Sequence, residues 1–304
     1  MGEPPPVHDL ACGVLSLRAE RGLVPAVRSL LEQSEPLEIV VVNSGGGQAR
    51  RKLISAGIDV RVIEVPERLF PGAARNAALE ATRAAYVSFL AADCVALPGW
   101  VAGRLREHRR GAVAVAGTMA NAYRHSLSAR AAYLLLHNRR MPETPAHMRL
   151  LYSLSYERAV FDRHGRFRED LLAGEDSEFN ARMETEAEIA WAPDVRAAHR
   201  NPRNPVALVR DQYRRGSRRI AMERIDGLGH RSNVIRGARL NIGWSVDQAR
   251  RVADSAERRR LLRARPLIVA GSLAYRAGAY VELARGRTCA SLNETALAVD
   301  RAEL

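Results

Sequence analysis

Two adjacent acids, Glu175 and Asp176, open a stretch whose pattern is typical of an α-helix, and they are well suited to acid–base chemistry. A carboxylate in such a place can hold a hydroxyl group of a substrate and accept its proton. Acids in the first turn of a helix also complement the helix dipole, so a purely structural role is the alternative. The pair is therefore a candidate general base together with a neighbouring acid.

Asp93 ends the apolar segment 85–93, which is typical of a buried strand. A carboxylate there is well placed to hold a divalent cation that bridges phosphate oxygens, with a turn or capping role as the alternative. Arg75 and Asn76 lie in the first turn of a predicted helix over 71–84. They could hold a diphosphate or a base, or Arg75 could simply be solvated.

A glycine-rich turn, Ser44 to Gly47, follows the β-branched run that ends at Asn43. Such a turn between strand and helix can present backbone N–H groups to a phosphate. A tight strand-to-helix turn without a ligand is the alternative. The glycine spacing fits neither the dinucleotide-binding fingerprint nor the phosphate-binding loop of nucleoside triphosphatases.

These residues come from segments that alternate between strand and helix patterns. Strands are predicted at 10–17, 37–43, 59–65 and 85–93, and helices at 22–33, 48–57 and 71–84. Such alternation predicts right-handed βαβ units around a parallel sheet. Ligands of these sheets bind at the carboxyl ends of the strands, which is where Asn43, Ser44 and Asp93 lie.

The pattern is less regular beyond residue 100. We expect a strand over 111–122, a helix over 126–140, a helix beginning at 174 and a strand pair over 188–200. Basic helices follow from about residue 210. A helix over 266–284 would gather six apolar residues on one face, namely Leu267, Ala270, Leu273, Ala277, Val281 and Ala284.

Composition limits the function classes. The chain has 304 residues, 47% of them apolar, and a net charge of +13. The excess charge lies late in the chain, since residues 201–304 hold 21 basic and 10 acidic residues whereas residues 1–100 hold 10 and 11. Three isolated cysteines support neither a zinc knuckle nor a disulfide framework, so a reducing compartment is expected. No signal peptide and no apolar run of membrane-spanning length is visible.

The ordered set of motifs resembles family 2 of the inverting, GT-A-type glycosyltransferases, from about Leu10 to Gly216. The matching segments are LEIVVVNSGG, PGAARNAALEAT, YVSFLAADCVALPGW, FDRHGRFREDLLAGEDSEFNARM and HRNPRNPVALVRDQYRRG. The resemblance implies an α/β GT-A domain over 1–216, with a Rossmann-like, mostly parallel sheet flanked by helices. A basic α-helical extension over 217–304 would follow it.

The resemblance also implies roles for single residues. Asp176 would be the catalytic base, with Glu175 beside it in the acceptor pocket. The nucleotide-sugar donor would be held by residues at the strand ends and on the helix that begins at residue 71, namely Asn43, Ser44, Arg75, Asn76, Ala92 and Asp93.

The implied cofactor is Mg²⁺ or Mn²⁺ on the donor diphosphate, bound by Asp93 at the second acid of the family's DXD motif. His199 resembles a histidine that helps to close the metal site in some relatives. Gln212, Arg214 and Arg215 stand where processive relatives carry a QxxRW motif.

The sequence departs from the family pattern at several positions. The first DXD acid is Ala91, and the usual pair of acids after the second strand is Asn43-Ser44. The missing carboxylates weaken the expected grip on ribose and metal. One aspartate with the diphosphate and waters can still hold Mg²⁺, and His199 could add a ligand for Mn²⁺.

The expected reaction moves a sugar from a nucleotide-sugar donor to a hydroxyl group of a polysaccharide, glycolipid or other cell-envelope precursor, with inversion. The alternative is a non-catalytic GT-A-like protein that binds nucleotides or sugars, or acts as a membrane scaffold. A sugar-1-phosphate nucleotidyltransferase is a further rival, but its glycine-rich basic loop is not found in LACGVLSLRAERG.

The basic C-terminal third has three interpretations: a solvated helical appendage, a helix lying in the membrane interface, or a nucleic-acid binder. Segment 266–284 contains Arg276 and Glu282, so it should not cross a bilayer. The aromatic fraction of 5% is small for base-stacking surfaces. We therefore expect a cytoplasmic protein that is peripheral on the anionic inner face of the cell membrane rather than bound to nucleic acid.

Overall fold

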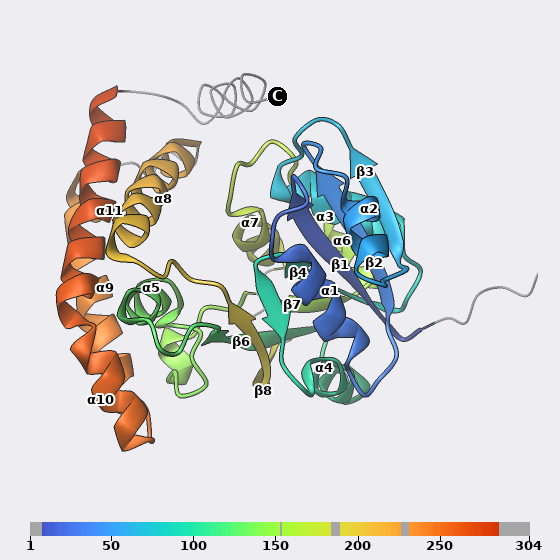
Figure 1. Cartoon of the computed structure of the whole chain (residues 1–304), viewed down its shortest axis with the longest axis horizontal. Helices are drawn as coiled ribbons and strands as arrows, with labels where there is room; N and C mark the ends of the chain where they lie inside the picture. The colour runs from blue at the N-terminus through green and yellow to red at the C-terminus, as the bar shows by residue number, and fades with distance from the viewer. Residues whose placement is uncertain (1–7, 153, 184–188, 226–230, 286–304) are drawn as a thin grey trace, which may run out of the picture. The chain divides into compact units, whose positions relative to one another are not determined.

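The structure is a computed structural model that describes residues 8–152, 154–183, 189–225 and 231–285. The chain divides into two compact units (Figure 1). The first combines Met1–Thr118 with Leu151–Ala198, and the second combines Met119–Leu150 with His199–Leu304. The domain boundary predicted after residue 216 falls within a helix of the second unit, α8 (Pro205–Ile225).

The first unit begins with the predicted alternation of strands and helices. Its strands are β1 (Leu10–Leu17), β2 (Glu38–Ser44), β3 (Arg61–Val65) and β4 (Tyr86–Ala91). The connecting helices are α1 (Leu23–Leu31), α2 (Ala49–Ser55) and α3 (Pro71–Glu80). β1 pairs in parallel with β2 and β4, and β2 pairs in parallel with β3. The carboxyl ends of these strands therefore lie along one edge, as the sequence predicted.

Later strands extend this sheet, namely β5 (Cys94–Ala96), β6 (Ala114–Asn121), β7 (Leu154–Glu157) and β8 (Ile189–His199). The helices between them are α4 (Trp100–Arg109), α6 (Ala159–His164) and α7 (Glu175–Arg182). The strand order is β3-β2-β1-β4-β7-β6-β8-β5, and β7 runs antiparallel to both β4 and β6. The fold is a mixed α/β fold with a mostly parallel sheet flanked by helices, as expected.

The strand pair predicted over 188–200 was wrong, because β8 is a single strand of 11 residues. Pro193 and Asp194 lie within this strand and do not divide it. In the structure the Pro193 carbonyl accepts a hydrogen bond from the Thr118 hydroxyl at 3.0 Å. A proline is tolerated in a strand where its missing N–H is not needed for pairing.

The core of the first unit explains why these segments became strands and helices. Val40, Val41 and Val42 of β2 are all completely buried, as expected for a parallel strand covered on both faces. A cluster of aromatic rings connects β4 to α7, and it includes Phe89, Phe161, Phe167, Phe179 and Tyr156. This cluster supports the beginning of α7, where the candidate general base lies.

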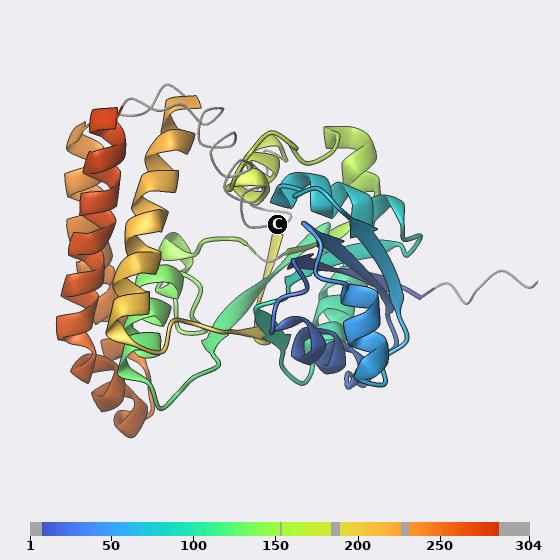
Figure 2. The ribbon, with the colours of Figure 1, turned by 45° about the horizontal axis from the view of Figure 1, so that its top comes forward.

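The second unit is helical. It contains α5 (Leu127–His137), the short 3₁₀ helix η1 (Ala146–Met148), α8, α9 (Arg231–Arg251), α10 (Ser255–Arg263) and α11 (Arg265–Arg285). α8 and α11 run side by side (Figures 1 and 2). They approach closely because each contributes a glycine: a Cβ at Gly216 would overlap the Tyr275 carbonyl oxygen, and one at Gly278 would overlap that of Tyr213.

The packed face of α11 is not the apolar face that the sequence suggested. Its buried residues are Ile268, Gly271, Ser272, Gly278, Ala279 and Glu282. The six predicted apolar positions are all exposed or only partly buried. Close helix packing selected mostly small residues, with Ile268 as the large apolar exception, whereas Leu267, Leu273 and Val281 stay at least partly at the surface. Among the described residues, every helix falls short of the length and apolar character needed to cross a bilayer.

Candidate active site

The predicted donor residue Asn43 joins the two loops that follow β1 and β2. Its Oδ1 accepts a hydrogen bond from the Ala19 backbone N–H at 2.8 Å, and its Nδ2 donates to the Gly46 carbonyl at 2.7 Å. The Ser44 carbonyl accepts from the Arg18 N–H at 2.8 Å. Both Asn43 and Ser44 are buried. Their contacts therefore shape the carboxyl edge of the sheet.

The glycine turn depends on left-handed backbone. Gly45, Gly46 and Gly47 have φ values of 74°, 85° and 91°, a region that glycine adopts without steric cost. A Cβ at Gly47 would overlap the backbone of Arg18, whereas one at Gly46 would meet nothing within 4 Å. Lys52, the single lysine of the chain, donates to the Ala19 and Glu20 carbonyls. Contacts with neighbouring residues thus hold the turn in place, and the backbone at Gly46 has free space beside it.

Asn76, on α3, is buried and holds the segment that leads towards α7. Its Nδ2 donates to the Phe167 carbonyl at 2.9 Å and to Glu169 Oε1 at 2.8 Å. Its Oδ1 accepts from the Phe167 N–H at 3.1 Å. The Asn76 amide therefore fixes the geometry around α7 through contacts within the protein.

Arg75, the neighbouring residue on α3, meets the two acids that begin α7. Its Nη1 donates to Glu175 Oε1, and its Nη2 lies 3.8 Å from Asp176 Oδ2. The side chains of Arg75, Glu175 and Asp176 are 16%, 6% and 22% exposed. The structure thus brings together residues predicted from two separate motifs, since Arg75 and Glu175 lie a hundred positions apart in sequence.

The first turn of α7 places Asp176 and Glu175 at the positive end of the helix dipole. Gly174 precedes the helix with a φ of 86°, and Asp176 Oδ1 accepts from the Ser177 N–H at 2.8 Å. The buried Tyr156 hydroxyl donates to Asn180 Oδ1 at 2.9 Å. Burial raises the pKa of Tyr156, and the Asp176 charge raises it further. The tyrosine is therefore a neutral hydrogen-bond donor beside the acids.

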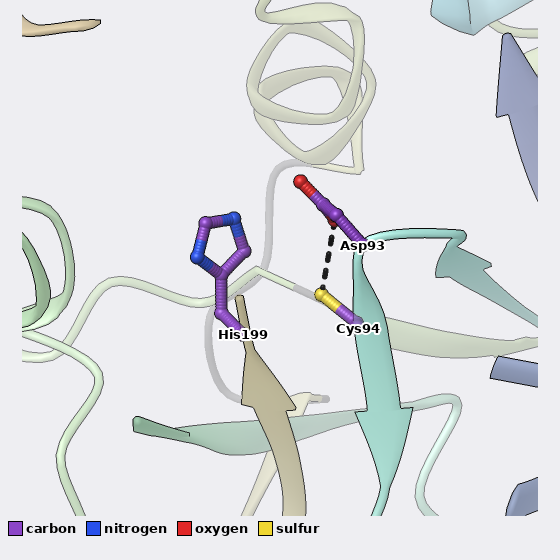
Figure 3. A group of neighbouring side chains, drawn as sticks. All are labelled: Asp93, Cys94 and His199. Carbon is purple, nitrogen blue, oxygen red and sulfur yellow. Dashed lines mark hydrogen bonds between the residues drawn. The ribbon is translucent and has the colours of Figure 1, made fainter. Parts of the chain in front are cut away.

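A second group of chemically active side chains consists of Asp93, Cys94 and His199 (Figure 3). Asp93 follows β4, Cys94 begins β5, and His199 is the last residue of β8. One carboxylate oxygen, the sulfur and one ring nitrogen all lie within 4.8 Å of one another. Oxygen, sulfur and nitrogen donors at this spacing fit a first-row divalent cation.

Cys94 is the member that sequence reasoning missed. Its Sγ donates to Asp93 Oδ1 at 3.4 Å, and the residue is buried. Its position next to Asp93 was the available signal, but an isolated cysteine without a CxxC partner did not indicate a ligand. Ala92, between Ala91 and Asp93, is buried and donates its N–H to the Leu15 carbonyl at 2.9 Å, which fixes the start of this turn.

His199 is held by residues of the second unit. Its Nδ1 lies 2.9 Å from Asn201 Oδ1, and its ring centroid lies 5.1 Å from that of His137. His137 is buried, and neither ring nitrogen has a hydrogen-bond partner among the described residues. Burial and the nearby His199, Arg140 and Arg215 hold the pKa of His137 well below its usual value. His137 is therefore neutral.

The three residues of the degraded QxxRW motif lie on α8. Asp211 accepts hydrogen bonds from Gln212 Nε2 at 3.3 Å and from Arg215 Nε at 2.8 Å. Arg214 is exposed. Gln212 and Arg215 are thus linked through one carboxylate, whereas Arg214 faces solvent.

Comparisons with known proteins add to this geometry. Residues 14–167 match the family described as glycosyl transferase family 2. No curated protein matches the sequence. Among solved structures, the mannosyltransferase PcManGT from Pyrobaculum calidifontis, in complex with GDP-Man and Mn²⁺, is similar with a TM-score of 0.58 and 16% identity. The similarity covers 92% of this chain and 88% of that one.

The S. aureus protein TarS (residues 1–349), in complex with UDP-GlcNAc, has a TM-score of 0.49 and 17% identity over 92% of each chain. The family match covers just over half of the chain, from β1 to the segment that Asn76 holds, and includes Arg75, Asp93 and Cys94. The chain belongs to glycosyl transferase family 2.

Proposed function

We propose that the protein transfers a sugar from a nucleotide-sugar donor to a hydroxyl group of a polysaccharide, glycolipid or other cell-envelope precursor, with inversion. The carrying observation is the pair of acids at the start of α7, contacted by Arg75. A protein that only binds nucleotides or sugars would have no need for two adjacent acids held by a partly buried cation. This observation favours the enzyme over the non-catalytic alternative.

The proposed reaction is a single displacement. Asp176 accepts the proton of the acceptor hydroxyl, and the acceptor oxygen forms a bond to the anomeric carbon. The bond from that carbon to the diphosphate oxygen breaks, and the nucleoside diphosphate leaves with the electron pair. Attack from the opposite face inverts the configuration. Asp176 is suited to this role because it is the more exposed of the two acids.

We place the donor at the carboxyl edge of the parallel strands. Asn43 and Ser44 shape the two loops there, and the open backbone at Gly46 can approach a phosphate. Ala92 and Asp93 lie at the end of the neighbouring strand β4. The PcManGT structure, which shares the fold and holds GDP-Man, supports a nucleotide sugar as the donor class.

Asp93, Cys94 and His199 are the residues proposed to hold a divalent ion, Mg²⁺ or Mn²⁺. A histidine nitrogen and a sulfur favour Mn²⁺ or a softer ion over Mg²⁺, which prefers oxygen ligands. When bound, such an ion would neutralise charge on the departing diphosphate. Gln212, Arg214 and Arg215, at the position of the QxxRW motif on α8, are proposed as further functional residues.

A thermal-shift screen tests the donor and metal assignments together. Nucleoside diphosphates of each base are added with and without Mn²⁺, since a ligand that binds only the folded state raises the unfolding temperature. We expect one base to give a Mn²⁺-dependent shift that Asp93→Ala abolishes. No shift with any nucleotide would overturn the proposal and leave the sugar-binding or membrane-scaffold alternatives.

We also infer that the second unit docks on an anionic membrane surface, through the exposed face of α11. Val269, Leu273 and Tyr280 are 44%, 55% and 37% exposed. Their spacing of four and seven residues places them on one side of the helix. An exposed apolar row on a long helix is typical of a surface that another phase or molecule covers.

The charge on these helices supports an anionic partner. Seven arginines on α10 and α11 are exposed or half-buried, namely Arg258, Arg259, Arg260, Arg263, Arg265, Arg276 and Arg285. The two acids of these helices offset little of this charge, because Glu257 is shared between Arg130 at 3.0 Å and Arg260 at 3.9 Å, and Glu282 is buried. Apolar side chains between arginines suit the interface of an anionic bilayer. The proposed location is thus the inner face of the cell membrane.

Vesicle co-sedimentation tests this docking. The protein should bind vesicles of phosphatidylcholine with phosphatidylglycerol, but not phosphatidylcholine alone, and salt should weaken binding. Leu273→Glu should reduce binding at least about tenfold, since it removes an apolar group that the bilayer would bury and adds a negative charge. Ile54→Glu, at an equally exposed apolar position on α2, is the matched control and should bind normally. Equal binding by both variants would exclude α11 as the docking face.

A further inference from the structure

We propose that Arg75 positions the acids of α7 for catalysis instead of holding the donor nucleotide, as the family resemblance predicts. The proposal rests on the function proposed above for Asp176. Its basis is the set of contacts that Arg75 makes within the first unit, with α7 on one side and two aromatic rings around it. Each of these contacts constrains the guanidinium group in a different way.

Aromatic rings fix the orientation of the guanidinium. Arg75 Cζ lies 5.5 Å from the ring centroid of Phe89 and 5.5 Å from that of Phe167. The two rings meet edge to face at 5.5 Å. Cation–π contacts of this kind are strongest where water is excluded. Arg75 is therefore held on two sides before it meets the acids.

The acids constrain the other end of the guanidinium. Nη1 donates to the buried carboxylate of Glu175, and Nη2 faces Asp176. If Arg75 moved to a donor phosphate, Glu175 would be left buried without this partner, and an uncompensated buried charge is unfavourable. Staying with the acids avoids that loss. Because Glu175 directly precedes Asp176 in the chain, its contact with Arg75 also holds the backbone of Asp176 in place.

The groups around Asp176 come from three elements of the first unit. Arg75 approaches from α3, Glu175 lies beside it on α7, and the Tyr156 ring lies on β7. Arg75 is the cation among these three groups, and each of its two terminal nitrogens faces one of the acids. Without it, the two acids would have only the helix dipole as compensation, and the start of α7 would lose the contact that ties it to α3.

The test compares Arg75→Ala, Arg75→Lys and a matched control, Arg166→Ala. The Arg166 side chain makes an exposed ion pair with Glu80 of α3 at 3.2 Å. Its removal changes the charge near the same helix and leaves in place the hydrogen bond from Arg182 of α7 to the Arg166 backbone carbonyl. Three quantities are measured for each variant: kcat, the KM of the donor, and the Kd of GDP and UDP. Added guanidinium chloride tests whether the missing group can be replaced from solution.

For Arg75→Ala we expect kcat to fall about 100-fold, since misplacement of a reacting group by about 1 Å can have this effect. The Kd of the nucleoside diphosphate and the KM of the donor should each change less than about threefold. Guanidinium should restore part of the activity. Arg75→Lys should recover part of the rate but not all of it, because lysine supplies the charge without the fork.

A carboxyl NMR spectrum at one fixed pH makes the result independent of turnover. With ¹³C-labelled aspartate, and Asp176 assigned through Asp176→Asn, the Asp176 carboxyl signal should move in Arg75→Ala and keep its wild-type position in Arg166→Ala. If the signal moves in this way but the wild type transfers no sugar, the proposed function fails and the positioning role stands. If the signal keeps its wild-type position in Arg75→Ala, or the nucleotide Kd rises in step with lost turnover, the proposal is wrong, and in the second case Arg75 is a donor ligand.

Discussion

At the scale of single residues, Glu175 and Asp176 are adjacent but differ in their exposure and their contacts. Glu175 is buried and accepts a hydrogen bond from Arg75, so its carboxylate is committed within the protein. Asp176 is more exposed, and one of its oxygens accepts from the Ser177 N–H. The other oxygen faces Arg75 at 3.8 Å, which is long for a hydrogen bond. An acceptor hydroxyl can therefore reach Asp176 more readily than Glu175.

This difference predicts the effect of Asp176→Asn. The amide cannot accept the acceptor proton as a base, so turnover should fall by about 10²- to 10⁴-fold. Donor binding should persist, because the loops shaped by Asn43 and Ser44 lie on other elements. Rate measurements at saturating donor and a nucleoside diphosphate titration separate the two effects. Normal turnover by this variant would remove Asp176 from the role of base.

The sequence predicted these site residues to different degrees. Asp93, Arg75 and the acids of α7 were identified from their places in strand and helix patterns, and the structure joins Arg75 to the acids. The internal roles of Asn43 and Asn76 could not be foreseen, because their partners are backbone atoms of distant loops. Cys94 was missed since only folding brings it beside His199.

At the scale of elements, local periodicity predicted the strands and helices of the βαβ units well. The apolar positions of each segment mark the face that packs against the core, and their spacing distinguishes a strand from a helix. The antiparallel direction of β7 had no local signal, because pairing with β4 and β6 joins segments far apart in sequence. The pattern of apolar residues also did not predict which face of α11 is packed. It depends on the close approach of α8, which Gly216 and Gly278 permit.

Two glycines in helices should therefore respond oppositely to alanine. Gly278→Ala adds a Cβ against the Tyr213 carbonyl, so it should destabilise the protein by about 1–2 kcal/mol despite the better helix propensity of alanine. Gly243→Ala, on α9, adds a Cβ that meets nothing within 4 Å and should stabilise by about 0.5–1 kcal/mol. Urea unfolding of both variants measures the difference. Effects of the same sign would contradict the proposed packing of α8 and α11.

At the scale of the whole molecule, each unit buries a neutral histidine. In the first unit His108 Nδ1 lies 2.7 Å from the Ala112 carbonyl, and Nε2 lies 2.8 Å from the Ser155 hydroxyl. A carbonyl only accepts, so Nδ1 carries the proton and Nε2 accepts from Ser155. Burial, and to a lesser extent Arg104, lower the pKa of His108 to about 4. His137 plays the same part in the second unit, with its pKa also lowered by burial.

These lowered pKa values predict a loss of stability in mild acid. The unfolded chain binds protons at these histidines near pH 6.5, whereas the folded chain does not until about pH 4 at His108. Stability is therefore full above pH 6.5 and falls as the pH drops towards 4. For His108 alone the loss between pH 7.5 and 5.0 is about 2 kcal/mol.

Urea unfolding at these two pH values checks the prediction, with His108→Gln as the comparison. Glutamine can offer a donor and an acceptor to the same partners but does not titrate, so this variant should lose about 2 kcal/mol less than wild type on acidification. Part of the pH dependence should remain in the variant, because His137 still titrates on unfolding. An equal loss in both proteins would mean that His108 is charged in the folded state.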